Sequence, residues 1–356
     1  DEEYQKLGVA VVESVEDCDI LIGVKEVPIE QLIPNKKYLF FSHTFKEQPY
    51  NRQLLKAVID KNIQLIDWEV IKDSKGRRLI AFGRYAGIVG CYNGFLAYGK
   101  KSGAYNLKPA HECENRADME AQLVNIKLPN NFKIVITGQG RVGGGAIEII
   151  EKINLKEVTS PEFLNNDFNE PVFTQLAVDE YNAKPDGSSF SKSDFYEDPS
   201  NFVSAFNQYS SIADMYIACH YWDSEAPYIF TRDDAKAKDW NIQIVADISC
   251  DIDCAIASTL RPSTIADPLY GYNPITETED DFMKDGVIGV MAVDNLPCEL
   301  PLDASVDFGE MFLEHVLEPL MGNDPEDIIG RASETKNGQL TEHFSYLRDY
   351  VDGTTV

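Results

Sequence analysis

The sequence predicts an α/β protein of about two domains, built on parallel sheets. Apolar runs of strand length recur through the first third of the chain, and stretches with helical spacing separate them. These runs are nearly continuously apolar, which is typical of strands that are covered on both faces of a sheet. Further along, a glycine-rich turn joins an apolar run to an amphipathic stretch. A chain of 356 residues is long enough for two such domains.

The first third of the chain predicts four strands and one helix. The strands are expected at 18–24, 38–43, 63–69 and 79–83, and the helix at 50–61. The stretch Ala86–Lys100 predicts a helix that leaves this domain, and a second helical stretch follows near Arg116–Val124.

A new unit begins at Lys133, where a strand, the glycine-rich turn and a helix over 146–153 follow one another. Further strands are expected at 155–160, 215–222, 242–249 and 287–294, and a last helix near Phe308–Met321. The stretches 182–200 and 274–284 are polar and rich in turn-forming or acidic residues, so we expect loops there.

The charge of the chain excludes several classes of partner. Lys and Arg total 32 against 59 Asp and Glu, which gives a formal charge of -27. So acidic a surface repels phosphate backbones and anionic lipid, so we expect no nucleic-acid and no membrane partner. Seven sparse cysteines are typical of reduced thiols, and the acidic start DEEYQK shows no secretory signal, so a cytoplasmic protein is expected.

The glycine-rich turn carries the strongest chemical signal. Gly138, Gly140 and Gly143 form G-x-G-x-x-G directly after an apolar strand and directly before a helix, which is the context this motif needs. Gly138 permits a tight turn, Gly140 lets the backbone approach a pyrophosphate, and Gly143 lets the helix pack closely on the strand. The helix N-terminus then offers free N–H groups to an anion. We therefore expect a dinucleotide-binding domain.

The choice between NAD and NADP stays open at this stage. An acidic residue at the end of the second strand, some 20 residues on, would bind the adenine ribose of NAD. That strand is expected to end at Val158, Thr159 and Ser160, with Glu157 nearby. No arginine stands there for the 2′-phosphate of NADP.

Charged residues also end the expected strands of the first domain. Lys25 follows the first strand, His43 ends the second with Lys46 three residues on, and Glu69 ends the third. Because parallel strands end at one edge of a sheet, we expect these four residues to converge. Such a group could hold a carboxylate substrate and move protons. Taken alone, Lys25 or Glu69 is more typical of a surface charge at a strand end, and His43 alone could be a satisfied buried histidine.

No metal site is expected. Cys250 and Cys254 flank a DID sequence, but no second pair completes four ligands. Serine hydrolase chemistry lacks the G-x-S-x-G elbow. His220, at the end of an expected strand, is explained either as a cofactor contact or as a packed core histidine.

Several blocks of the sequence resemble one enzyme family. They are GVKEVP, FFSHTFK, LIDWE, GRRLIAFGRYAG, GQGRVGGGAIE, VADIS and VDNLPCELPLDAS. In this order and spacing they are similar to the saccharopine dehydrogenase and lysine–ketoglutarate reductase family, whose relatives include alanine dehydrogenase. The resemblance covers about Cys18 to Leu320, and the stretch around DFYEDPSNFVSAFNQY is most similar to the reductase branch.

The resemblance implies two Rossmann-like domains with the active site in the cleft between them. Residues 1–85 with 300–356 would form a discontinuous catalytic domain, and 86–299 the dinucleotide-binding domain. It also implies a strand–helix–strand unit of about fifty residues that this sequence does not contain ahead of DEEYQK.

The resemblance further implies roles for individual residues. Lys25 and His43 would be the acid–base pair, Lys46 would bind substrate carboxylate, and Glu69 would tune the charge of the pair. The expected cofactor contacts are Gly138, Gly140, Arg141, Val142, Gly143, Cys219, Asp247, Ser249, Asp294 and Asn295.

The implied reaction is a reversible oxidation at a secondary amine, which interconverts saccharopine with lysine plus 2-oxoglutarate and uses NAD or NADP. One alternative is a dehydrogenase of the alanine dehydrogenase or opine type, which acts on another 2-oxo acid. Another is a nucleotide-sensing Rossmann module without turnover. The expected partners are the amino-acid and 2-oxo-acid substrates, and the chain is expected to be a monomer or homodimer.

Overall fold

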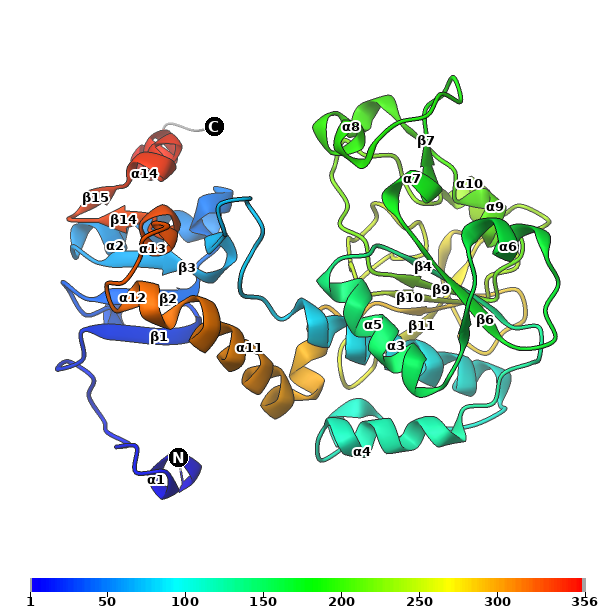
Figure 1. The fold of residues 1–356 in the computed structure, drawn as a ribbon, viewed down its shortest axis with the longest axis horizontal. Coiled ribbons are helices and arrows are strands. Elements are labelled where there is room, and N and C mark those ends of the chain that lie inside the picture. The colour runs from blue at the N-terminus through cyan, green and yellow to red at the C-terminus, as the bar shows by residue number, and fades with distance from the viewer. Residues whose placement is uncertain (1, 354–356) are drawn as a thin grey trace. The chain divides into compact units, whose positions relative to one another are not determined.

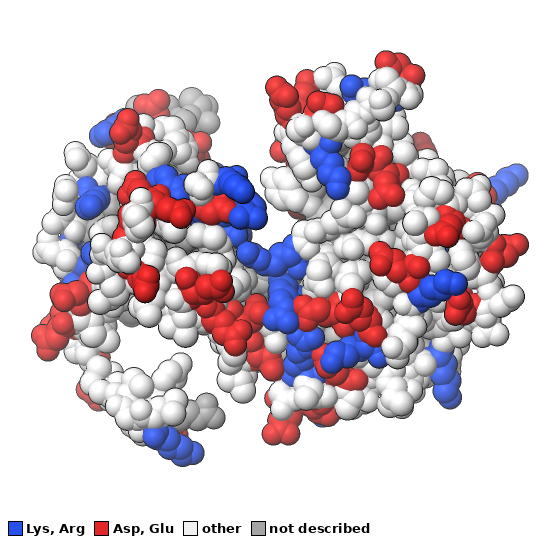
Figure 2. All heavy atoms as spheres, viewed as in Figure 1, with Lys and Arg blue, Asp and Glu red and all other residues white. Residues whose placement is uncertain are grey.

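The computed structural model describes residues 2–353 and divides the chain into two compact units (Figure 1). One unit consists of Asp1–Ala81 and Asp307–Val356, and the other of Phe82–Val306. Both belong to the α/β class with parallel sheets, as the sequence predicts. Figure 2 shows Asp and Glu side chains spread over the visible face of each unit. Among the described residues, no helix is long and apolar enough to cross a bilayer.

The first unit is built on a three-stranded parallel sheet in the order β1-β2-β3. The strands are β1 (Ile20–Lys25), β2 (Lys37–Phe41) and β3 (Gln64–Asp67), and they confirm three of the four strands predicted here. Helix α2 (Arg52–Asp60) connects β2 to β3 and buries Leu54, Leu55 and Val58 in the core of this unit. Its apolar residues at i, i+1 and i+4 form the one stripe that such a crossover helix must bury.

The C-terminal part of the chain completes this unit. Its elements are α12 (Leu317–Leu320), α13 (Ile328–Ala332), β14 (Thr335–Lys336), β15 (Gln339–Leu340) and α14 (Arg348–Asp352), while α11 (Pro301–His315) crosses the boundary between the units and α1 (Glu2–Lys6) opens the chain. Ser333 pairs with Ile66 of β3, and the N–H of Glu334 donates to the carbonyl of Leu65. The segment after α13 therefore lies beside β3, although about 270 residues separate them in sequence.

The second unit contains an eight-stranded sheet in the order β12-β11-β13-β10-β9-β4-β6-β5. Its strands are β4 (Lys133–Thr137), β5 (Lys156–Glu157), β6 (Val172–Leu176), β9 (Met215–Ala218), β10 (Ile244–Asp247), β11 (Leu269–Asn273), β12 (Thr278–Asp280) and β13 (Ile288–Met291). The pairs from β13 through β5 are parallel, and β11 and β12 add an antiparallel edge.

Helices and a small hairpin surround this sheet. They are α3 (Gly83–Ser102), α4 (Arg116–Ala121), α5 (Arg141–Lys152), α6 (Ser160–Asn165), α7 (Val178–Tyr181), α8 (Lys192–Glu197), α9 (Asn207–Ser210) and α10 (Arg232–Ala235), with β7 (Asn182–Ala183) paired to β8 (Val203–Ser204). Helices α3 and α5 cross with their backbones in close contact. A Cβ on Gly87 would collide with the carbonyl of Val142, and one on Gly145 with the carbonyl of Arg84.

Four predictions of local structure need correction. The run at 79–83 forms no strand: Leu79 donates to the carbonyl of Ile71, Ile80 and Ala81 are buried, and α3 begins at Gly83. The strand expected at 155–160 pairs only over Lys156–Glu157, while β6 was not predicted. The expected loop at 274–284 contains β12, and the one at 182–200 contains β7 and α8.

Candidate functional site

The parallel sheet of the first unit brings the predicted strand-end residues to one edge. Lys25 is the last residue of β1, where it pairs with Phe41, the last residue of β2. His43 stands two residues after β2, and Glu69 stands two residues after β3. Since β1, β2 and β3 are parallel, their carboxyl ends share this edge.

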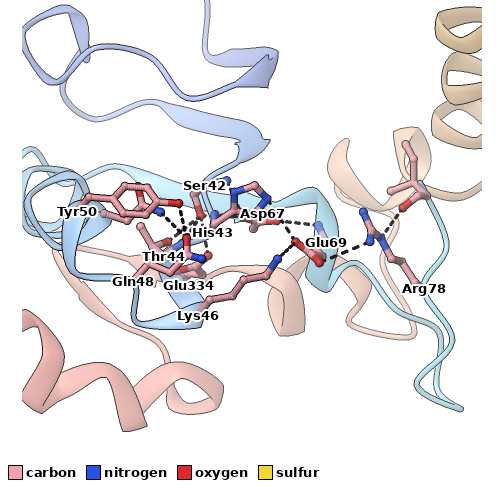
Figure 3. Close-up of polar contacts among 12 residues, drawn as sticks. Ser42, His43, Thr44, Lys46, Gln48, Tyr50, Asp67, Glu69, Arg78 and Glu334 are labelled. Atoms are coloured by element: carbon pink, nitrogen blue, oxygen red, sulfur yellow. Dashed lines mark hydrogen bonds and ion pairs between the residues drawn. The ribbon is translucent and has the colours of Figure 1, made fainter. Parts of the chain in front are cut away.

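The carboxylate of Glu69 is the centre of a group of basic side chains (Figure 3). Its Oε2 lies 2.8 Å from Nζ of Lys46 and 3.5 Å from Nε2 of His43. Its Oε1 lies 3.7 Å from a guanidinium nitrogen of Arg78. Sequence reasoning missed Arg78, which directly precedes the run 79–83 that was wrongly predicted as a strand. The block GRRLIAFG contains Arg78, but the alternation of apolar and polar residues does not indicate that its side chain points to Glu69.

His43 is held in an unusual backbone conformation by the residue that ends β3. Its φ is 55°, in the left-handed region that non-glycine residues rarely adopt. Asp67, which is fully buried, accepts the N–H groups of Ser42 at 2.6 Å, His43 at 3.0 Å and Glu69 at 2.7 Å. One carboxylate therefore fixes the backbone at two functional positions, His43 and Glu69.

The surroundings of His43 keep its imidazole neutral. Partial burial lowers its pKa below the ordinary value of 6.5, and the charges of Lys46 and Lys25 lower it further, while Glu69 and Asp67 oppose them. At pH values above this pKa, one ring nitrogen carries a proton and the other has a free lone pair. Its side chain is 31% exposed, so a substrate can reach it. A neutral, accessible imidazole is suited to accept or donate a proton near neutral pH.

The site is locally positive in a chain of strongly negative charge. Lys25, Lys46 and Arg78 bring three cations to this edge, where Lys46 and Arg78 both pair with Glu69, which is 26% exposed. Lys25 is exposed, and its charge acts on His43. Guanidinium and ammonium groups in this arrangement are suited to binding carboxylates.

Beneath His43 lies a buried polar cluster that sequence reasoning missed. Ser42, Thr44, Asp67 and Glu334 are at most 1% exposed. The hydroxyl of Ser42 contacts Asp67 at 2.7 Å, Thr44 at 2.7 Å and Glu334 at 3.1 Å, and the hydroxyl of Thr44 contacts Glu334 at 2.6 Å. Burial raises the pKa of the Glu334 carboxyl to about 8.

In the second unit, the glycine-rich turn has the shape that a pyrophosphate requires. Gly138 has φ +91°, and a Cβ there would lie 2.6 Å from the carbonyl of Cys219. A Cβ on Gly143 would collide with the carbonyl of Gly138, whereas one on Gly140 would meet nothing within 4 Å. The first and third glycines are thus required by packing, and the second faces open space where a ligand can reach the backbone.

Helix α5 begins directly after this open position. Gly140 is its N-cap residue and no side chain caps the first turn, so its N–H groups can bind an anion. Arg141 is exposed in this first turn, while Val142 is half-buried and packs on the core beside Gly83. These residues fit a dinucleotide pyrophosphate.

The other predicted cofactor contacts follow the strands next to β4. Asp247 is fully buried and accepts hydrogen bonds from Ser249 Oγ at 2.6 Å, Thr259 Oγ1 at 2.6 Å and the N–H of Cys250 at 3.0 Å. Burial raises its pKa. With these contacts Asp247 shapes the backbone after β10, much as Asp67 does after β3.

Cys219, Asp294 and Asn295 complete this edge. Cys219 is buried after β9, and burial raises its thiol pKa well above the ordinary value, so it stays uncharged. Asp294 and Asn295 are exposed after β13, and Asn295 Oδ1 contacts the thiol of Cys298 at 3.2 Å. His220 is buried, and its Nδ1 lies 2.9 Å from Thr137 Oγ1 at the end of β4.

The described residues contain no group of three His, Cys, Asp or Glu side chains that could hold a metal ion. Cys250 is half-buried and its Sγ lies 3.2 Å from the carbonyl of Ala292, while Cys254 lies four residues on.

Comparisons with known proteins agree with this geometry. Residues 1–89 match the family model "Alanine dehydrogenase/PNT, N-terminal domain". The chain is 28% identical over 402 residues to alpha-aminoadipic semialdehyde synthase of Bos taurus, and the match covers 98% of this chain and 43% of that protein. It is 24% identical over 347 residues to the saccharopine dehydrogenase [NAD(+), L-lysine-forming] of Yarrowia lipolytica, over 89% of this chain and 80% of that protein.

The chain is similar to saccharopine dehydrogenases and to alpha-aminoadipic semialdehyde synthases. The resemblance found in the sequence, to the saccharopine dehydrogenase and lysine–ketoglutarate reductase family, is thereby confirmed. Among solved structures, an L-alanine dehydrogenase matches with a TM-score of 0.63 at 14% identity, over 99% of this chain and 86% of that one, which shows a shared fold. The chain spans less than half of the length of the first synthases that it matches.

Proposed function

We propose that this chain interconverts saccharopine with lysine plus 2-oxoglutarate, and that NAD or NADP carries the electrons. The relationship of the chain to amino-acid dehydrogenases rests on the similar proteins described above. The observation that carries the proposal is the group around Glu69. It combines a neutral, accessible imidazole with three cations that can bind the carboxylates of the substrate.

In the proposed oxidative direction, His43 and Lys25 move the protons. His43 takes the proton from the secondary amine, so that the nitrogen lone pair can drive departure of hydride from the adjacent carbon. Water then adds to the resulting imine, and the carbinolamine collapses to a primary amine and a 2-oxo acid. Lys25 and His43 carry the protons that these two steps release and consume. When bound, a nicotinamide dinucleotide supplies the hydride acceptor.

The cations hold the substrate rather than react with it. Lys46 and Arg78 each have one contact to Glu69, and both side chains are partly exposed, at 38% and 32%. A substrate carboxylate that binds them competes with Glu69 for the same donors. Glu69 thus keeps the cations in position, and it also raises the pKa of His43, which opposes the effect of Lys46.

The two units have different proposed roles. The first holds substrate and moves protons, and the second binds the dinucleotide on the turn at Gly138–Gly143. The proposed reaction needs both roles, because hydride passes from the bound substrate to the bound cofactor. The cytoplasmic location and the monomeric or homodimeric state stay predictions.

We also propose that NAD is preferred over NADP. The strand next to β4 is β6, and not the stretch around Glu157 that counting along the sequence suggested. After β6 the chain enters α7, where Glu180 accepts the N–H of Ala177 at 2.7 Å and Asp179 is exposed. A carboxylate at this edge binds ribose hydroxyls and repels a 2′-phosphate.

The test is a steady-state assay of the full chain with lysine plus 2-oxoglutarate, in which oxidation of NADH and of NADPH is compared. The expected result is turnover that requires both substrates. A panel of other amines and 2-oxo acids serves as the control. Turnover with alanine's oxo acid, pyruvate, plus ammonia, and none with lysine, would instead support the alanine dehydrogenase alternative, which the match at residues 1–89 favours.

A further inference from the structure

The buried cluster beneath His43 contains more short oxygen–oxygen contacts than its hydroxyl protons can serve. Three of its contacts are 2.6 to 2.7 Å long: Ser42 to Asp67, Ser42 to Thr44, and Thr44 to Glu334. The fourth, from Ser42 to Glu334, is the longest at 3.1 Å. Ser42 and Thr44 have one hydroxyl proton each, so two protons are available for these contacts when both carboxyl groups are ionised.

A third proton would give each of the three short contacts one proton, and the geometry indicates which carboxyl group carries it. Asp67 already accepts three backbone N–H groups, two of them on the same oxygen that faces Ser42, so it has no place for a proton there. Glu334 accepts no backbone N–H among the hydrogen bonds of its carboxyl group, which are those to Ser42 and Thr44. The extra proton therefore belongs on Glu334.

We propose that Glu334 is a neutral carboxylic acid that heads a chain of hydrogen bonds ending at Asp67, and that it acts as a positioning residue for His43 and Glu69. Glu334 Oε2–H donates to Thr44 Oγ1, Thr44 O–H donates to Ser42 Oγ, and Ser42 O–H donates to Asp67 Oδ2. Each of the three short contacts then contains one proton, and only the contact at 3.1 Å is left without one.

The position of Glu334 explains why its proton matters to the site. Its backbone is fixed to β3 by the bond from its N–H to Leu65, and Thr341 donates to its carbonyl. The hydroxyl of Ser42 bridges Glu334 to the carboxylate of Asp67. That carboxylate fixes the backbone of His43 and Glu69. A negative charge on Glu334 would face the negative charge of Asp67 inside the protein and would remove the first donor of the chain.

Other titratable and charged groups face Glu334 from the elements packed against it. From the C-terminal segment, Tyr346 and Tyr350 face it, and burial raises the pKa of both, that of Tyr350 to about 12. Glu47 and Arg52 act on the same tyrosines, and Asp67 acts on Glu334 directly. The rise of the Glu334 pKa to about 8, which burial causes, agrees with a proton retained at pH 7.

The positioning role of Glu334 rests on the proposed function, whereas its protonation state does not. The first two tests below therefore need no turnover. In the wild-type chain with 13C-labelled glutamate, the Glu334 carboxyl carbon should titrate near pH 8 and be silent around pH 4 to 5. The resonance is identified by its absence in Glu334→Gln. Titration at the ordinary glutamate pKa of about 4.3 would overturn the proposal, whatever the variant does.

The second test compares the thermal stability of wild type and Glu334→Gln from pH 4.5 to 9. An acid whose pKa is raised by folding binds more protons in the folded state, so stability falls as pH rises from its unfolded pKa towards its folded one. The ratio of the folding constants, variant over wild type, should rise up to about tenfold per pH unit within that range and be constant above it. A ratio independent of pH would overturn the proposal. Exposed Glu342→Gln, from the same segment, is the matched control and should show no such trend.

The third test reads the effect on the site. In wild type, kcat should fall as pH rises through 8 while KM for the dinucleotide is unchanged, and Glu334→Gln should lack this fall because an amide keeps one donor and one acceptor without ionising. An identical alkaline limb in both proteins would refute the positioning role. If no substrate is turned over at all, the proposed function fails, and the labelled-carbon and stability tests still decide the state of Glu334.

Discussion

The two sheet edges that carry the candidate site are built in opposite ways. In the first unit, the groups that reach solvent are charged side chains, and Asp67 below them uses its carboxylate to hold the backbone of His43 and Glu69. In the second unit, the edge is formed by backbone without side chains, and glycines at 138 and 143 are required by collision. The first edge is suited to reacting with a ligand, and the second to holding one.

The buried aspartates make the same comparison on a smaller scale. Asp67 follows β3 and accepts three backbone N–H groups, so its charge fixes the main chain directly. Asp247 follows β10 and accepts two hydroxyls and one N–H, and burial raises its pKa. Asp67 thus fixes the backbone that directs the side chains of His43 and Glu69. Asp247 instead ties together the loop that follows β10.

The largest expected effect is on the reacting side chains of the first edge. Lys25→Met and His43→Gln should each lower kcat/KM by about 10²-fold or more, because each removes a group that carries a proton in the reaction. Steady-state rates with lysine and 2-oxoglutarate measure this. The exposed residues Lys56 and His343 of the same unit give matched controls, K56M and H343Q, which should retain full activity. Unchanged turnover in both K25M and H43Q would end the assignment.

At the second edge, the effect should fall on binding and not on chemistry. Gly140→Ala places a methyl group where nothing in the protein stands, so the fold should be as stable as wild type while the Kd for the dinucleotide rises about tenfold or more. Calorimetry and melting curves measure the two quantities. Gly144→Ala, whose Cβ also meets nothing, is the control, and equal binding by both variants would show that the backbone at 140 does not touch the cofactor.

A smaller effect is expected on the choice of cofactor. Asp179→Asn should raise KM for NADH about tenfold and improve the relative use of NADPH, since it removes a charged hydrogen-bond acceptor for ribose. Glu157→Gln is the matched control because it changes the acidic residue on the edge strand β5. An effect of E157Q alone would mean that sequence counting, and not strand order, identifies the ribose contact.

The smallest effect is a pair of opposite shifts in the pH profile. His43 must be neutral to take a proton, so kcat/KM in the oxidative direction should fall on the acid side, below pH 6.5, because burial and the charges of Lys46 and Lys25 lower the His43 pKa. Glu69 raises that pKa, so Glu69→Gln should move the acid limb to lower pH. Lys46→Met should move it to higher pH. Shifts in the same direction would show that these charges do not act on the titrating group.

Much of the fold and part of the site could be predicted because they depend on local pattern. Strands β1, β2 and β4 are short apolar runs that end at or next to a polar residue. The glycine motif is recognisable from a stretch of eight residues. The meeting of His43, Lys46 and Glu69 followed from one rule, that parallel strands end together.

The parts that could not be predicted depend on contacts that are distant in sequence. Glu334 lies 290 residues from Thr44, and its burial beside β3 has no trace in the surrounding stretch RASETKNG. Strand β6 was missed because its residues, VFTQL, carry a polar pair, and its place next to β4 is set by topology. In the apolar run at 79–83, Ile80 and Ala81 are buried outside any strand, and sequence periodicity cannot distinguish such packing from a strand.

The crossing of α3 and α5 links cofactor affinity to residues that never touch the cofactor. The first turn of α5 is where an anion would bind, and the depth of that helix is set by Gly87 and Gly145 against the partner backbone. Any methyl group added there must push the helices apart and carry the anion site with it. Libraries that randomise only the loop would therefore overlook the positions at which homologous enzymes can tune their hold on the dinucleotide from a distance.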